Sequence, residues 1–252
     1  HVQQAAPRLG PGRHRTEQHP GAWRLPVCAG PAPTWGHLRW PRTVGTFPAP
    51  RRRSPGPGGS PIAPPDADLE PVGIELTDGV VTLRPIAEHD VDQITEACQD
   101  PVIQRYIPVP RPYARSDAET YVALSLDFWP TGRKYVFTVV EPDRPALLLG
   151  VVSLTVAGRC GNAAYWLAPG ARGRHVASRA LRLLADWAFS HLDLAVLLLE
   201  IHDTNEASKR VAVHAGFHHS GGVEVATDSG PRSALLYVRL ASDLPPLPRP
   251  TG

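Results

Sequence analysis

The 252-residue sequence lacks methionine altogether, and its first residue is His1. A chain that begins in this way is expected to be a fragment, or the product of a gene model extended upstream of its true start. The charged beginning is not followed by the apolar run of about 7–15 residues that a secretory signal needs. No apolar stretch reaches the roughly 18 residues of a membrane-spanning helix. We therefore expect neither a secretory signal nor a membrane partner.

Cysteine is scarce as well. Cys28, Cys98 and Cys160 are odd in number, widely spaced and in no C-x-x-C pair. This pattern excludes a disulfide framework and a zinc site, and it predicts reduced thiols in a cytoplasmic protein. His214, His218 and His219 fit no common ligand spacing, so we interpret them as surface histidines and expect no metal.

Lysine and acidic residues are nearly absent from the first quarter of the chain. Residues 1–65 contain 14 Pro, 9 Gly, nine Arg, no Lys and one acid, which gives a net charge of +8 and leaves −6 for the rest. Such a composition cannot bury enough apolar surface to offset the entropy of ordering. We predict a disordered tail and linker over 1–73, one folded domain over 74–243, and a non-globular end over 244–252. We favour the interpretation that the basic tail is an extension without a specific partner. The alternative is a tail that binds nucleic acid.

In the folded part, apolar residues recur at helical spacing in some segments and at the alternating spacing of a strand in others. This pattern predicts a mixed α/β domain. A capping box, Ser116-Asp117-Ala118-Glu119, marks the start of the second helix. The predicted order is β-α-α-β-β-β-α-β-α-β-β. Strands are expected at 80–84, 135–141, 147–157, 163–168, 195–201, about 217–225 and 234–241, and helices at 87–99, about 116–129, about 174–191 and 205–215.

The segment Pro169-Gly170-Ala171-Arg172-Gly173-Arg174-His175-Val176-Ala177-Ser178 lies between a predicted strand and the strongest predicted helix. A helix start leaves several backbone N–H groups without partners and carries partial positive charge. After a tight turn that contains glycine, these groups can converge on a phosphate or pyrophosphate. Arg172 and Arg174 add charge that suits a multiply anionic ligand. The alternative is a plain turn with two solvated arginines.

Three segments in order carry a resemblance to a known family. They are Tyr165-Trp166-Leu167-Ala168-Pro169, then Arg172-Gly173-Arg174-His175-Val176-Ala177, then Asn205-Glu206-Ala207-Ser208 with Ala215-Gly216-Phe217. Together they resemble the GNAT acyl-CoA N-acyltransferases, and within them the branch that acetylates the N-termini of ribosomal proteins. The resemblance covers 74–243 and implies an α+β fold with a central mixed, mostly antiparallel sheet flanked by helices.

The resemblance also implies roles for individual residues. Backbone N–H groups of the loop and helix start would face the pyrophosphate of acetyl-CoA, Leu167 and Ala168 would run beside its pantetheine arm, and Asn205 would hold the same region. The Ser208 hydroxyl would protonate the departing CoA thiolate. The implied cofactor-binding set is Leu167, Ala168, Arg172, Gly173, Arg174, His175, Val176, Ala177, Ser178 and Asn205, with Ser208 and Asn205 as the catalytic pair.

His175 departs from the family pattern, which has glycine at this position. Glycine there allows close approach to phosphate or a backbone conformation that a Cβ disfavours. A histidine can donate an N–H to phosphate, and it can equally crowd the ligand.

The sequence therefore predicts an N-acetyltransferase that moves an acetyl group from acetyl-CoA to a primary amine, with a protein N-terminus as the favoured acceptor. Two alternatives stay open: an enzyme that acts on a small amine such as an antibiotic or polyamine, and a non-catalytic CoA-binding module, because of His175. No motif identifies the general base. Glu224 and Asp228 lie near the final hairpin, and we interpret both as solvated surface carboxylates.

Overall fold

The computed structural model describes residues 74–227 and 230–243. The predicted tails, 1–73 and 244–252, and Asp228 lie outside these residues. The strands are β1 (Leu76–Thr77), β2 (Thr82–Pro85), β3 (Lys134–Val140), β4 (Gly150–Ala157), β5 (Cys160–Leu167), β6 (Val196–His202), β7 (His218–Thr227) and β8 (Gly230–Leu240). The helices are α1 (Val91–Ala97), α2 (Pro101–Tyr106), α3 (Arg115–Phe128), α4 (Val176–His191) and α5 (Glu206–His214).

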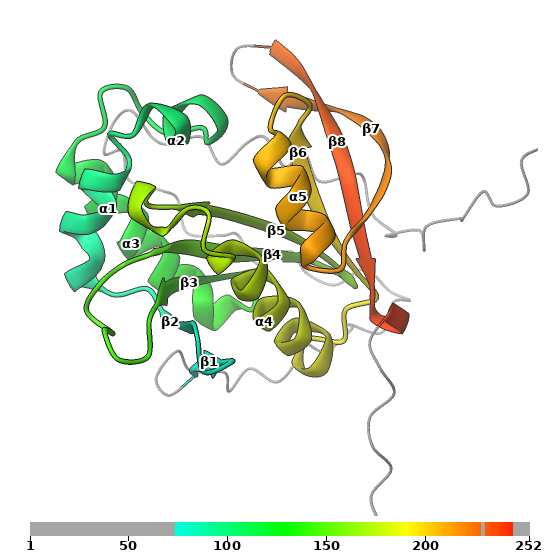
Figure 1. Cartoon of the computed structure of the whole chain (residues 1–252), viewed down its shortest axis with the longest axis horizontal. Helices are drawn as coiled ribbons and strands as arrows, with labels where there is room; N and C mark the ends of the chain where they lie inside the picture. The colour runs from blue at the N-terminus through cyan, green and yellow to red at the C-terminus, as the bar shows by residue number, and fades with distance from the viewer. Residues whose placement is uncertain (1–73, 228–229, 244–252) are drawn as a thin grey trace, which may run out of the picture.

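Within the described ranges the strands form one sheet in the order β1-β2-β3-β4-β5-β6-β8-β7. Neighbouring strands are antiparallel except β5 and β6, which are parallel. The predicted fold class and element order are confirmed, with β1 and α2 as additions (Figure 1).

One helix was not predicted, and one predicted helix cap was wrong. The stretch 100–115 contains α2, which Asp100 caps by accepting hydrogen bonds from Val102 N and Ile103 N at 3.0 and 2.9 Å. The capping box at Ser116 does not form, because α3 already begins at Arg115. Asp117 instead reaches back to accept from Ala114 N at 2.8 Å, and this acid fixes the start of the helix.

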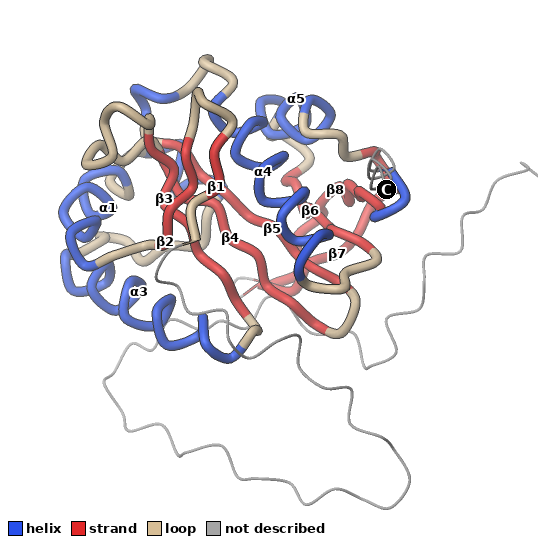
Figure 2. Tube along the Cα trace, turned by 90° about the horizontal axis from the view of Figure 1, so that it is seen from below, coloured by secondary structure: helices blue, strands red, loops and turns tan. Residues whose placement is uncertain are grey.

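The sheet is covered by helices on both faces (Figure 2). Side chains of a strand alternate between faces, so Val136 packs with α1 and α3 while its neighbour Phe137 packs with α4. The same alternation separates Val151 from Val152 on β4. We call these two sides the α1–α3 face and the α4–α5 face.

The parallel strands β5 and β6 separate from one another. They pair only from Cys160 to Asn162 against Val196 to Leu198, although β5 continues to Leu167 and β6 to His202. In Figure 1, β3–β5 cross the view while β8 runs steeply beside β6. The described part of the chain therefore has an opening between the carboxyl ends of two parallel strands, where ligands of α/β sheets commonly bind.

None of the described helices is long and apolar enough to cross a membrane. Cys98 has a free, buried thiol as predicted.

A buried carboxylate joins the first strand pair to the helices. Asp90 has no exposed surface, and it accepts hydrogen bonds from Arg84 at 2.6 and 2.9 Å, from Ala87 N at 2.9 Å and from Thr138 at 2.8 Å. Burial alone would raise the pKa of Asp90, but these donors outweigh it and hold the pKa below its ordinary value.

We expect Asp90→Asn to lower the free energy of unfolding by about 2–3 kcal/mol at neutral pH, because the charged bonds to Arg84 are lost. The folded-state pKa is depressed, so this stability is present above the unfolded carboxyl pKa of about 3.9 and is lost as the pH falls. Urea unfolding at pH 7 and in acid checks this, with exposed Glu88→Gln as the control. A difference from the wild type that does not shrink in acid would contradict it.

Candidate functional site

The loop before α4 presents a row of free backbone donors. Residues 173–178 have no backbone or side-chain acceptor for their N–H groups within the described residues, since the first helical bond is from Arg179 N to His175 O. Gly173 has a φ of +75°, which turns the chain into the helix. The Ser178 hydroxyl donates to His175 O at 3.0 Å, so this side chain closes the turn while its N–H remains free. The segment fits an anionic ligand such as the predicted pyrophosphate.

His175 occupies the left-handed region, with a φ of +58° and a ψ of +11° at the N-cap position of α4. This conformation costs a residue with a Cβ about 1–2 kcal/mol. Glycine would adopt this conformation without that cost. The His175 ring is exposed and packs edge-on against His214 at the end of α5, with ring centroids 5.7 Å apart.

Arg172 holds the loop rather than pointing freely to solvent. Its guanidinium donates to both carboxylate oxygens of Asp100, at 2.6 and 3.3 Å, and to Leu167 O at 3.2 Å. The Arg172 guanidinium holds the pKa of Asp100 below its ordinary value. Arg172 therefore ties the end of β5 and the loop to the cap of α2.

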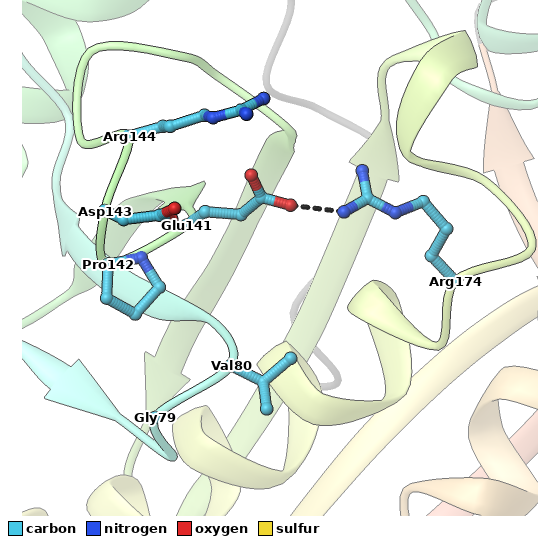
Figure 3. Close-up of a pocket in the computed structure, with 7 residues that line it drawn as sticks. All are labelled: Gly79, Val80, Glu141, Pro142, Asp143, Arg144 and Arg174. Carbon is cyan, nitrogen blue, oxygen red and sulfur yellow. Dashed lines mark hydrogen bonds and ion pairs between the residues drawn. The ribbon is translucent and has the colours of Figure 1, made fainter.

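Arg174 pairs with Glu141 at the end of β3, across a cavity of about 540 Å³ (Figure 3). Arg144 and Asp143 also line this cavity. Both predicted arginines thus have carboxylate partners in the structure. An anionic ligand at the loop would have to compete with Glu141 for Arg174.

We expect Glu141→Gln to tighten the binding of CoA about two- to fivefold, because it releases Arg174 from an exposed ion pair worth about 0.5–1 kcal/mol. Calorimetric titration measures the effect. Asp143→Asn removes a charge from the same cavity without touching Arg174 and serves as the control (Figure 3). Weaker binding by Glu141→Gln would mean that Glu141 positions Arg174 for the ligand.

The end of β5 turns backbone groups that have no strand partner toward the opening, although Leu167 O accepts a hydrogen bond from Arg172. Ala168 N donates to Leu149 O at 2.9 Å, and backbone bonding alternates along an antiparallel pair. Ala168 and Trp166 therefore bond toward β4, whereas Tyr165 and Leu167 direct their backbone groups to the edge from which β6 has diverged. The N–H of Leu167 is directed to this edge, whereas the N–H of Ala168 is already used. The contact of Leu167 and Ala168 with an extended ligand arm stays a prediction.

The start of α5 places the Ser208 hydroxyl beside the Tyr165 hydroxyl of β5, at the same opening. Asn205 caps the helix by accepting from Ser208 N at 3.0 Å. The Ser208 and Tyr165 hydroxyl oxygens are 2.7 Å apart. Burial raises the pKa of Tyr165 to about 12, while its hydrogen bond to Ser208 lowers it. Tyr165 is therefore an uncharged phenol at neutral pH, and it can donate to Ser208 and leave the serine proton free.

Sequence reasoning missed Tyr165 and Asp100 as members of the site. Tyr165 lies in a motif that was recognised, but nothing local indicates that it meets Ser208. Asp100 could have been found, because Asp followed by Pro at the first helical position is a helix start signal. Glu224 is exposed on β7, as predicted. No group of three metal-ligating side chains forms within residues 74–227 and 230–243.

Comparison with known proteins agrees with this geometry. A family model described as an acetyltransferase (GNAT) domain matches residues 81–218, more than half of the chain. No curated protein matches the sequence.

Several solved structures share the fold. RimJ of Mycobacterium smegmatis in complex with CoA-disulfide has a TM-score of 0.59 and 22% identity, over 69% of this chain and 88% of that one. Ribosomal-protein-S5-alanine acetyltransferase of Vibrio fischeri has a TM-score of 0.59 and 17% identity, over 69% and 100%. The microcin C7 self-immunity acetyltransferase MccE, in complex with acetyl-CoA and AMP, has a TM-score of 0.57 and 16% identity, over 65% and 93%.

Proposed function

Because the chain belongs to the GNAT acetyltransferase family and is an acetyl-CoA-dependent N-acetyltransferase, we propose that its acceptor is the free N-terminus of a protein or peptide. One of the structural relatives described above is named as a ribosomal-protein-S5-alanine acetyltransferase. The resemblance of the loop and the Asn205–Ser208 segment to that branch supports the same acceptor. A cytoplasmic location stays a prediction.

We place acetyl-CoA along the opening between β5 and β6. The free N–H groups of 173–178 bind the pyrophosphate, with Arg174 exchanging Glu141 for a phosphate oxygen. The pantetheine arm runs along the exposed edge at Tyr165 and Leu167, and the amide nitrogen of Asn205 donates to it. The thioester then lies beside Ser208. The row of free donors at the start of α4 is the observation that carries this placement.

Transfer is direct and needs no covalent enzyme intermediate. A neutral amine forms a C–N bond to the thioester carbonyl, and the carbonyl electron pair moves to oxygen, where a free strand N–H stabilises the charge. The nitrogen, positively charged after the attack, loses a proton to water. When the carbonyl re-forms, the C–S bond breaks, sulfur takes the electron pair together with a proton from Ser208, and Ser208 regains a proton from solvent. Tyr165 donates to the Ser208 oxygen and favours this proton transfer.

An acetyl-CoA consumption screen tests the proposal. Its substrates are peptides that begin with Ser or Ala, the same peptides with a blocked N-terminus, free amino acids, polyamines and aminoglycosides. We expect turnover with the free peptides and none with the blocked ones. Turnover confined to the small amines would replace the proposed acceptor.

Two alternatives have specific support. The similarity to MccE is only slightly less extensive than that to the ribosomal-protein enzyme, and it supports a small-molecule acceptor as the first alternative. The strained His175 favours a CoA-binding module without activity. CoA binding without turnover on any amine would support the second alternative.

A further inference from the structure

Each partly or fully buried arginine within the described ranges pairs with an aspartate, with one exception. The pairs are Arg84 with Asp90, Arg172 with Asp100, Arg179 with Asp78 and Arg239 with Asp186. The exception is Arg232 on β8, whose Nε atom is buried and has no hydrogen-bond partner in the described structure. A buried donor without a partner costs free energy, which an acceptor group on a ligand can recover.

Arg232 lies on the α1–α3 face of the sheet, beyond the end of β6. Leu235 and Tyr237 pack into the core with α4 and α5, so the alternation of β8 directs Arg232 and Ala234 to the other face. Ala234 pairs with His202, the last residue of β6, and Arg232 lies two residues further along β8. Arg232 is therefore placed at the carboxyl end of β6, which borders the opening.

The charge of Arg232 acts on the opening itself. Glu200 of β6 accepts a hydrogen bond at 3.2 Å from Asn162, the last residue of β5 that pairs with β6. Burial raises the pKa of Glu200, and the Asn162 hydrogen bond and the charge of Arg232 oppose this rise. Glu200 and Arg232 form no ion pair in the described structure, so the guanidinium is near this carboxylate but keeps its N–H donors available.

The two faces of the opening differ in what they offer a substrate. The free amides before α4 and the Ser208 hydroxyl of α5 lie on the α4–α5 face, where we place acetyl-CoA. On the other face, α1 and α3 pack against β3 and β4 (Figure 2). The acceptor therefore approaches the thioester over β6 and β8 on the α1–α3 face, where it meets Arg232.

The end of α2 forms the opposite margin of this approach. The Tyr106 ring lies edge-on to His202, with centroids 5.7 Å apart, and the Arg105 guanidinium lies 5.3 Å from the centroid of the Tyr106 ring. Asp203, an exposed acid at this margin, pairs with His202 rather than with either arginine. An acceptor that enters between α2 and the β7–β8 hairpin thus meets an arginine on each side (Figure 1).

We propose that Arg232 binds a carboxylate of the acceptor, so that the enzyme prefers amines that carry an acidic group close to the reacting nitrogen. This inference rests on the proposed function and narrows its substrate class. A guanidinium presents its N–H donors in a planar fork that matches a carboxylate, and the unpartnered Nε is one of them. Two sources can supply the carboxylate: an acidic side chain at the second position of a peptide, and the α-carboxylate of a free amino acid.

The test measures kcat/KM for peptides that begin with Ser-Asp, Ser-Asn or Ser-Lys and are otherwise identical. We expect the wild type to prefer Ser-Asp over Ser-Asn about tenfold or more, mainly through KM, and to use Ser-Lys least well. Arg232→Gln should remove most of this preference, and Arg232→Glu should reverse it. Arg133→Gln, which removes an exposed arginine just before β3, is the control and should behave as the wild type.

A conservative variant separates binding from a role in folding. Arg232→Lys keeps the charge without the fork, so it should retain a reduced preference for Ser-Asp. Added salt should weaken the wild-type preference, because the contact is between charges. Thermal unfolding shows whether each variant is folded. Loss of activity by Arg232→Gln that is equal for all three peptides would overturn the proposal in favour of a structural role.

Alanine and alaninamide distinguish the two sources of the carboxylate. Turnover of the Ser-Asp peptide but of neither small amine would support an acidic side chain. A preference for alanine over alaninamide that depends on Arg232, without turnover of any peptide, would support carboxylate binding and overturn the proposed protein acceptor. Equal wild-type turnover of the three peptides would overturn the role of Arg232 and leave the proposed function intact. A wild type that acetylates none of these amines would overturn both.

Discussion

Ser208→Ala is expected to lower kcat about 100-fold or more while changing the affinity for CoA less than about twofold. The reason is that the hydroxyl acts only when the C–S bond breaks, so its loss raises the barrier and not the ground-state energy. The fold should tolerate the change. Ser208 uses its backbone N–H, not its hydroxyl, to bond to the Asn205 cap, and alanine retains that N–H.

Steady-state kinetics and CoA titration check this prediction, with Tyr165→Phe as its companion. Phenylalanine keeps the ring in the sheet but removes the hydroxyl that lies 2.7 Å from Ser208. We expect a smaller loss of kcat, about tenfold, and little further loss when it is combined with Ser208→Ala, because the two hydroxyls act in series. Full activity of Ser208→Ala would exclude this residue as the proton donor. Losses that multiply in the double variant would show that the hydroxyls act independently.

The fold was readable from the sequence where the signal is local. Helix α4 was found because Val176, Ala180, Leu184 and Ala188 recur at helical spacing, and all of them are buried. The start of α3 was missed because Ala114 gives no capping signal, while a plausible capping box stood two residues further on. The helix is fixed instead by Asp117, which reaches back to the Ala114 N–H. When two helix starts both satisfy the local capping rules, these rules cannot choose between them. The surrounding tertiary structure then determines where the helix begins.

Only part of the site could be predicted from the sequence. The free amides before α4 follow from a strand, a glycine turn and a helix, which are all local features. The pairs that shape the site join residues distant in sequence: Tyr165 with Ser208 is 43 positions apart, and Asp100 with Arg172 is 72.

Asp100→Ala is expected to weaken the fold and the binding of CoA at once. Asp100 caps α2 and pairs with Arg172, which holds the loop of the proposed CoA side. Loss of the cap costs about 1 kcal/mol, and loss of the charged hydrogen bonds costs about 1.5–3 kcal/mol more. We expect a decrease of about 2–4 kcal/mol in the free energy of unfolding and at least tenfold weaker binding of CoA.

Asp100→Asn separates the two contributions, because asparagine caps a helix about as well as aspartate but carries no charge. If the ion pair holds the loop, Asp100→Asn should lose CoA affinity nearly as much as Asp100→Ala and lose less stability. Arg172→Gln should match Asp100→Asn, and the double variant should lose little more than either one. Thermal unfolding with and without CoA measures both quantities on one sample. CoA affinity that Asp100→Asn leaves unchanged would mean that Arg172 holds the loop through Leu167 O alone, and that the charge of Asp100 is not needed for CoA binding.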